Sequence, residues 1–241
     1  NNSAGAFAVY LSTAKNNNFT VIFASNSHLL GYGLYAKNSD TNTVTQSRLW
    51  GGFYGAYLDG GSDYNTVSLS TVIGNGNHGF RILNSDTNTV TQSYLGGAVN
   101  GLFLDFGADW NAVSLSTMVG SSQYGLYAGG ADSNTVTQSY MWGGSRGVEL
   151  DSGADYNAVS LSTMIGNTDA GLFASVADFN TITQSYMWGV TRGAWLSGDA
   201  DRNAVSLSTM VGNIQFGFIG LGADSNTVTQ SYMWGSSRGA Y

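Results

Sequence analysis

The 241-residue chain contains no cysteine and no proline, and only 10% of its residues are charged. Without cysteine, the chain can form neither a disulfide nor a thiolate metal site. The net charge of −7 argues against nucleic acid as a partner, because phosphates attract basic surfaces. No apolar run reaches the roughly 18 residues of a membrane span, so we expect none.

The chain also lacks any sustained apolar pattern of helical period, so we expect little or no helix. Its apolar runs are short and rich in β-branched and aromatic residues. Glycine, serine, asparagine and aspartate separate them, which is typical of β-strands and turns.

One motif recurs at a constant step of 23 residues, and each copy begins with an asparagine. These residues are Asn42, Asn65, Asn88, Asn111, Asn134, Asn157, Asn180, Asn203 and Asn226. A fixed period of this size indicates stacked repeats. With three short strands per unit, the sequence predicts an all-β parallel β-helix of about ten coils. We expect one domain over residues 1–241, regular from 42 onward and less regular over 1–41.

The period also predicts which residues stack in columns. Residues equivalent to Val136 and Met141 should point inward, and the asparagines should form an amide ladder along the axis. A glycine column that includes Gly147 indicates a backbone position that a Cβ would obstruct. Near the start, Phe19-Thr20-Val21 is expected to replace Asn-Thr-Val.

The segment Gly-Leu-Tyr-Ala…Ala-Asp-Ser-Asn-Thr-Val-Thr at 125–137 resembles the repeat of right-handed parallel β-helix proteins. That superfamily includes pectate lyases, polygalacturonases, alginate epimerases and NosD-type periplasmic proteins. The resemblance covers residues 19–241 well and 1–18 loosely, and it implies the right-handed winding. It specifies a fold that hosts many unrelated functions.

Both ends of the sequence bear on its context. The chain starts at Asn1 instead of Met, and Ala240-Tyr241 falls within a coil. Solenoids need polar terminal caps, and neither end offers an obvious one. We therefore expect a segment of a longer secreted, extracellular or cell-surface protein, or a unit that stacks on other chains.

Two types of coil alternate from Asn42 onward. One type reads NTVTQSYMWG, as at 134, and the other reads NAVSLSTMIG, as at 157. The alternation indicates either a feature outside the core that recurs every second coil or the duplication of a two-coil segment.

The first candidate surface is an aromatic contact face. If Met141 points inward, its neighbours point outward, because side chains alternate along a strand. The predicted contact residues are Tyr140, Trp142, Tyr186, Trp188, Tyr232 and Trp234. An exposed aromatic surface of this length is typical of an interaction site for a protein chain or a sugar. A further outward column that includes Tyr57 and Phe173 is expected to add aromatic surface.

The second candidate surface is a flat, uncharged Thr/Ser face. It comprises Thr43, Thr45, Thr89, Thr91, Thr135, Thr137, Thr181, Thr183, Thr227 and Thr229, with Ala and Ser in the alternate coils. It resembles the Thr-x-Thr rows of β-solenoid ice-binding proteins. Ordinary solvated strand residues with favourable cross-strand Thr pairs are the alternative.

The third candidate is a column of aspartates that includes Asp132, Asp155 and Asp178. Stacked carboxylates repel one another, so something must offset the repulsion. We expect each to accept a backbone N–H bond in a turn, with bound Ca²⁺ as the alternative and no other cofactor.

An enzyme site is the less favoured hypothesis. Arg146, Glu149 and Asp151 lie close in sequence, and paired carboxylates serve glycoside hydrolysis. They are, however, spread by the repeat, and Arg146, Arg192 and Arg238 are expected to pair with surface acids. If the chain is an enzyme, a polysaccharide lyase or glycoside hydrolase is expected.

The sequence therefore predicts a structural or adhesive β-solenoid rod that binds itself, another surface protein or a polysaccharide through repeated exposed faces. The alternative is a carbohydrate-binding or polysaccharide-degrading β-helix, and ice binding through the Thr/Ser face is a third possibility.

Overall fold

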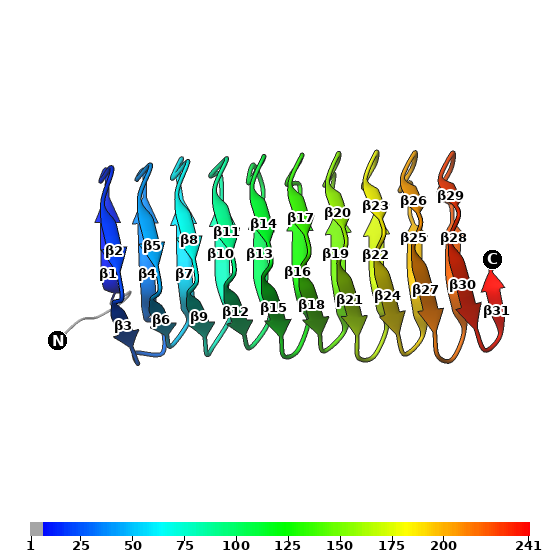
Figure 1. Ribbon diagram of the computed structural model, residues 1–241, viewed down its shortest axis with the longest axis horizontal. Helices are drawn as coiled ribbons and strands as arrows, with labels where there is room; N and C mark the ends of the chain where they lie inside the picture. The colour runs from blue at the N-terminus through cyan, green and yellow to red at the C-terminus, as the bar shows by residue number, and fades with distance from the viewer. Residues whose placement is uncertain (1–6) are drawn as a thin grey trace.

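The computed structural model describes residues 7–241, and all regular secondary structure in that range is β-strand. Within these residues there is accordingly no helix that could cross a membrane. The strands stack into a rod of successive coils, and equivalent strands lie side by side along its length (Figure 1). The predicted all-β parallel β-helix is confirmed.

Each coil contributes one strand to each of three parallel sheets, which we call A, B and C. Sheet A contains β1 (Phe7–Ser12), β4 (Tyr32–Lys37), β7 (Tyr54–Asp59), β10 (Phe80–Leu83), β13 (Leu102–Asp105), β16 (Tyr124–Gly129), β19 (Arg146–Asp151), β22 (Ala170–Ser175), β25 (Arg192–Ser197), β28 (Phe216–Leu221) and β31 (Arg238–Ala240). Sheet B contains β2 (Asn18–Thr20), β5 (Thr43–Thr45), β8 (Thr66–Ser68), β11 (Thr89–Thr91), β14 (Ala112–Ser114), β17 (Thr135–Thr137), β20 (Ala158–Ser160), β23 (Thr181–Thr183), β26 (Ala204–Ser206) and β29 (Thr227–Thr229). Sheet C contains β3 (Phe23–Asn26), β6 (Arg48–Gly51), β9 (Thr71–Gly74), β12 (Tyr94–Gly97), β15 (Thr117–Gly120), β18 (Tyr140–Gly143), β21 (Thr163–Gly166), β24 (Tyr186–Gly189), β27 (Thr209–Gly212) and β30 (Tyr232–Gly235).

The core is built from columns of like residues. Val113 pairs with Val136 in sheet B, and Met118 pairs with Met141 in sheet C. Met118 and Met141 are fully buried, and so is Leu102 of sheet A. Because each apolar side chain packs on its counterpart in the next coil, the core runs as one cluster along the rod.

Buried asparagines hold the corner between sheets A and B. Asn157 Oδ1 accepts the backbone N–H of Asn134 at 2.9 Å, and its Nδ2 donates to the Ala131 carbonyl at 3.0 Å. Direct amide-to-amide bonds occur near the N-terminus, where Asn42 Nδ2 donates to Asn65 Oδ1 at 3.1 Å. The ladder therefore joins mainly side chain to backbone.

The glycine column reflects close backbone contact between coils. A Cβ on Gly147 would lie 2.5 Å from the Ile165 nitrogen and 2.6 Å from the Gly171 carbonyl oxygen. Only glycine lets the neighbouring coils approach this closely.

The first coil keeps the same three sheets with a different register from the one predicted. Phe19 pairs with Val44 and fills its core position, while Asn18 pairs with Thr43. The placement of Phe19 at the asparagine position was therefore wrong, because Asn17 takes that place and bonds Asn42. Residues 1–6 of the less regular region lie outside the described residues.

Candidate functional site

The outer surface of sheet C is an aromatic and aliphatic face. Met141 is fully buried, Tyr140 is 41% exposed on one side of it, and Trp142 is half-buried on the other. The structure places Tyr140, Trp142, Tyr186, Trp188, Tyr232 and Trp234 together on this outer surface, which we call the sheet-C face. Thr163 and Ile165 of the intervening coil pair with Tyr140 and Trp142.

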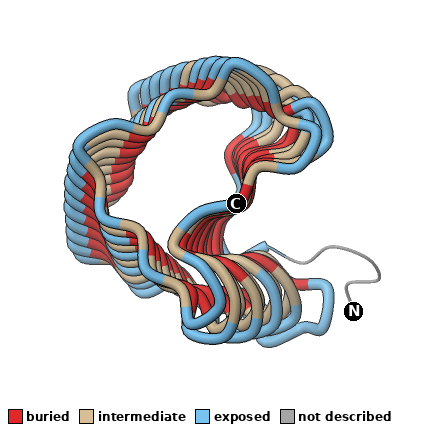
Figure 2. Tube along the Cα trace, turned by 90° about the vertical axis from the view of Figure 1, so that its right-hand side faces the viewer, coloured by how far each residue is buried: buried red, intermediate tan, exposed pale blue. Residues whose placement is uncertain are grey.

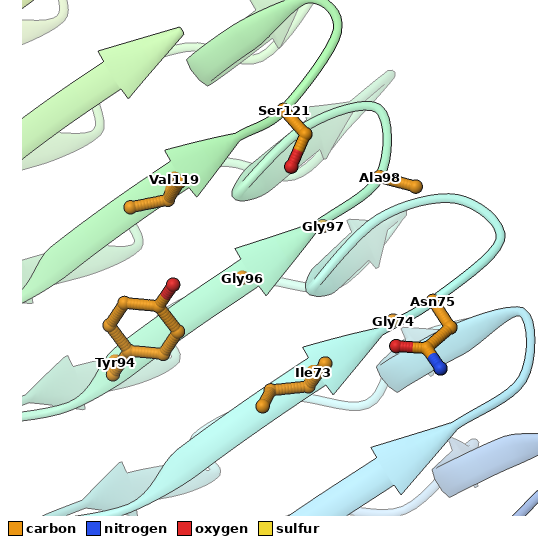
Figure 3. Close-up of a pocket in the computed structure, with 9 residues that line it drawn as sticks. All are labelled: Ile73, Gly74, Asn75, Tyr94, Gly96, Gly97, Ala98, Val119 and Ser121. Atoms are coloured by element: carbon orange, nitrogen blue, oxygen red, sulfur yellow. The ribbon is translucent and has the colours of Figure 1, made fainter.

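One position on the sheet-C face lacks a side chain. Gly96 pairs with Ile73 and Val119 on the two sides, where other coils carry tryptophan. A hollow of about 300 Å³ opens there (Figure 3). Tyr94 borders the hollow within the same strand, and Asn75 and Ser121 lie at the turns beyond the strand ends. The hollow thus combines an aromatic ring with an amide and a hydroxyl group.

The outer surface of sheet A is more enclosed. Seen along the rod, the cross-section is indented, and the C-terminus, which follows β31, lies at the indentation (Figure 2). Tyr57 and Phe173 are each only 9% exposed. The expectation that these two residues add exposed aromatic surface was therefore wrong, because arginines of neighbouring coils lie over their rings, Arg81 over Tyr57 and Arg146 over Phe173.

A partly buried ionic network crosses three coils on this side of sheet A. Arg146 bonds Glu149 at 2.6 Å and Asp169 at 2.9 Å, and Arg192 bonds Asp169 at 2.7 Å. The arginines also cover aromatic rings, with Arg146 3.9 Å from the Phe173 ring centroid. The network satisfies the charges internally, so both carboxylates are already engaged.

The predicted pairing with acids is confirmed for Arg146 and Arg192, and Asp169 is a partner that the sequence reasoning missed. The signal was present, because Asp169 lies one 23-residue period after Arg146 and one period before Arg192. For Arg238 the prediction was wrong, because it makes no ion pair within residues 7–241. Asp151, predicted near Arg146 and Glu149, ends strand β19 and makes no ion pair within residues 7–241. The network therefore extends along the stack and not along the strand.

The electrostatics of sheet A follow from burial. Burial raises the pKa of Glu149 above its ordinary value, although Arg146 opposes the shift. Burial also raises the pKa of Tyr127 to about 12. His78 stacks on Phe103 with ring centroids 4.4 Å apart, and burial lowers the pKa of His78 to about 3. The histidine is thus neutral in the folded protein.

The predicted Thr/Ser face lies on sheet B. Val136 is buried, and Thr135 and Thr137 stand on either side of it on the outer surface. Ser160 Oγ donates to Thr137 Oγ1 at 3.1 Å, and the same bond recurs from Ser114 to Thr91 at 2.9 Å. Hydroxyls of neighbouring coils are therefore linked in pairs.

The aspartates stack through the backbone. Asp132 Oδ1 accepts the backbone N–H of Asp155 at 2.9 Å, and Asp155 Oδ1 accepts that of Asp178 at 2.7 Å. Burial raises the pKa of Asp155, and the Asp178 amide opposes the shift. No group of three His, Cys, Asp or Glu residues suited to a metal occurs within residues 7–241. Calcium binding by Asp132, Asp155 and Asp178 stays a prediction.

Two family models match the sequence. The model described as right handed beta helix region matches residues 1–118, and the model described as periplasmic copper-binding protein (NosD) matches residues 106–240. The chain belongs to the NosD family. This membership confirms the resemblance to right-handed parallel β-helix repeats. No curated protein matches the chain.

The chain is also similar to solved structures, at low sequence identity. The mannuronan C-5 epimerase AlgE4 A-module of Azotobacter vinelandii is 12% identical, with a TM-score of 0.47, over 97% of this chain and 90% of that one. An alginate lyase from Paenibacillus sp. is 13% identical, with a TM-score of 0.45, over 95% and 97% of the two chains. At this level the similarity carries no argument about activity.

The residues of this chain do not fit a copper site. Copper favours thiolate, thioether or imidazole ligands, and the chain has no cysteine and two histidines. His78 is enclosed by aromatic rings, and the thioether of Met141 is fully buried in the apolar core. No group of three His, Cys, Asp or Glu residues within residues 7–241 could hold a metal ion.

Proposed function

We propose that the protein is a stiff, extracytoplasmic rod with a structural or adhesive role that attaches to its partner through the sheet-C face. The observation that carries the proposal is the repeated Tyr-x-Trp pair, with Tyr140 and Tyr186 exposed by 41% and 39%. Aromatic side chains offer a large contact area at low entropic cost and dominate interfaces. The family description as periplasmic supports a location outside the cytoplasm.

The rod geometry supports attachment more than catalysis. Side chains of one kind repeat along the axis in register, as where Tyr140 and Tyr186 flank Thr163. A repeated surface suits a partner that is itself extended or repetitive, since each contact can add to the next. Arg146, Glu149, Asp169 and Arg192 pair with one another in a partly buried network.

A carbohydrate is the second candidate partner, and the hollow at Gly96 favours it. The hollow presents the Tyr94 ring together with Asn75 and Ser121. Apolar sites with a few placed polar groups are typical of small-molecule recognition. Ice binding through the Thr/Ser face stays a prediction.

The test compares the wild-type protein with the double variant Trp142→Ser/Trp188→Ser. Negative-stain electron microscopy at several concentrations would report bundles of rods, and sedimentation with cellulose, chitin and calcium alginate would report sugar binding. We expect the variant to lose attachment at least about tenfold, as central tryptophans do at interfaces. Phe106→Ser, which changes an aromatic residue exposed by 60% outside the sheet-C face, is the control.

The outcomes separate the candidates. Bundles that disappear in the double variant support self-attachment, and loss of polysaccharide binding that Gly96→Trp reproduces supports the carbohydrate alternative. Single rods at every concentration without polysaccharide binding would overturn both.

A further inference from the structure

Two columns of exposed apolar side chains flank sheet B, one on each side of its short strands. The column just before the asparagine of a coil includes Tyr64, Trp110 and Tyr156, which are 61%, 67% and 58% exposed. The column four residues after the asparagine includes Leu69, Leu115, Leu161 and Leu207, which are 51–52% exposed. We call the outward residues of sheet B together with both columns the sheet-B face.

The flanking side chains are exposed in an unfavourable backbone conformation. Trp110 has φ of 59° and Leu115 has φ of 49°, in the left-handed region that favours glycine and asparagine. Exposure of an apolar side chain adds no stability to the single chain either. The conformation and the exposure together point to a contact outside the single chain.

Apolar and polar coils alternate on this face. Trp110 and Leu115 flank β14, whereas Ser133 and Gln138 flank β17 in the next coil. Apolar pairs recur as Tyr64 with Leu69 and Tyr156 with Leu161, and polar pairs recur as Thr41 with Gln46, Thr87 with Gln92, and Ser225 with Gln230. The pattern breaks at Phe179 with Gln184 and at Arg202 with Leu207. In each regular coil, the two corner residues are thus either both apolar or both polar.

Between the columns the surface is flat and its hydroxyls are already paired. Ser114 donates to Thr91 at 2.9 Å, and Ser68 donates to Thr45 at 3.0 Å. Because these donors have partners within the chain, covering them removes fewer bonds to water than covering free hydroxyls. The middle of the face can therefore be buried at modest cost.

We propose that the sheet-B face binds a second copy of this chain, with the two rods parallel and related by a twofold axis along the rod. This operation places the corner before the asparagine of one copy over the corner after the strand of the other, in the same coil. Trp110 then covers Leu115 of the second copy, and Ser133 covers its Gln138. In the apolar coils an aromatic side chain packs on an aliphatic one, and in the polar coils a hydroxyl group contacts a side-chain amide. Every contact occurs twice, as a twofold interface requires.

Charge favours the parallel over the antiparallel arrangement. The aspartate column, which includes Asp109 and Asp132, lies immediately beside the column that holds Trp110. Antiparallel face-to-face packing would set the two aspartate columns against each other, at a cost in repulsion. Parallel packing sets each against the leucine corner, where residues 115–117 and their repeats carry no acid.

The area is sufficient for a stable pair. The face is five residue steps wide at about 3.3 Å per residue, and about ten coils long at about 4.8 Å per coil. Width times length gives an area of roughly 800 Å² per copy. That is about the area each partner buries in a standard interface.

The alternation also fixes the register of the pair. A shift by one coil would set Trp110 over Gln138 and Ser133 over Leu115, burying polar groups against apolar ones. A shift by two coils restores the match but leaves two coils of each rod uncovered, so the unshifted pair buries the largest matched area.

The test is sedimentation equilibrium of the wild-type chain and of Leu115→Asn/Leu161→Asn. Asparagine tolerates the left-handed conformation, so the single chain should fold at least as well. We expect a wild-type dimer whose Kd rises about tenfold or more in the variant. Val176→Asn makes the same kind of change at an apolar residue that is 52% exposed, has φ of 49° and lies outside the sheet-B face, so it is the matched control and should change Kd little.

The orientation is tested with a spin label at Ser225→Cys, because the chain has no other cysteine. Parallel rods place the two labels about 20 Å apart, whereas antiparallel rods separate them by about 40 Å. A monomer at all concentrations, or a dimer unaffected by Leu115→Asn/Leu161→Asn, would overturn the proposal, and the longer distance would overturn its geometry. Loss of the dimer only in Trp142→Ser/Trp188→Ser would assign self-association to the sheet-C face instead.

Discussion

At the scale of single residues, His78 makes stability depend on pH. Its pKa is lowered from 6.5 to about 3 in the folded protein, chiefly by burial. The unfolded chain therefore takes up a proton that the folded chain refuses as pH falls below 6.5. The stability is fully present above that value and is lost progressively toward pH 3.

We predict that replacing His78 removes this dependence. Phenylalanine keeps the stacking between Tyr54 and Phe103 and cannot be protonated. Between pH 7 and pH 5, urea unfolding should show wild type losing about 2 kcal/mol relative to His78→Phe. Because the comparison is between two chains with the same carboxylates, the raised pKa values of Asp155 and Glu149 cancel. Parallel pH profiles for the two proteins would contradict the assignment.

At the scale of elements, the asparagine corner joins sheet A to sheet B through bonds between coils. Asn157→Ala would leave the backbone N–H of Asn134 without its acceptor, since Asn157 Oδ1 accepts it at 2.9 Å. A buried N–H without a partner costs about 1–3 kcal/mol. We predict that hydrogen exchange of the Asn134 amide accelerates about tenfold or more. Thr135→Ala, on the exposed surface of the same coil, should leave that rate unchanged, and equal rates in both variants would disprove the role of the corner.

The elements also show what sequence could and could not predict. The inward columns through Val136 and Met141 followed from the period, because stacking in register makes the repeat visible in the sequence. The cover over Tyr57 and Phe173 could not be predicted, because it comes from side chains of neighbouring coils, Arg81 and Arg146. The hollow at Gly96 required knowing that Ile73 and Val119 flank it across strands. The repeat pattern was therefore enough to predict which residues of a coil point inward. The form of the outer surface depends on contacts between coils, which the pattern does not show.

At the scale of the whole molecule, pairing through sheet B would leave both sheet-C faces open on the outer flanks of the pair. Two faces on one rigid body can engage an extended partner together, which raises overall affinity without a new contact. The proposed pair and the proposed attachment are thus compatible, and each uses a surface that the other leaves free.

Net charge then determines how the pair responds to salt. Each chain carries −7, and in the parallel pair the two aspartate columns stand more than about 20 Å apart across the face. The Debye length is about 30 Å at 0.01 M salt and about 8 Å at 0.15 M, so repulsion acts in the first condition and is screened in the second. We predict that the dimer Kd falls about threefold or more between these two conditions and changes little at higher salt.

Sedimentation equilibrium across the salt series measures this response, and its sign and shape distinguish the arrangements. An interface held by ion pairs would weaken as salt rises. Antiparallel rods with directly apposed aspartates would go on tightening toward 1 M, where the Debye length is about 3 Å, because charges that close are still poorly screened at 0.15 M. A Kd that falls and then levels near physiological salt is therefore the response expected of the parallel pair alone.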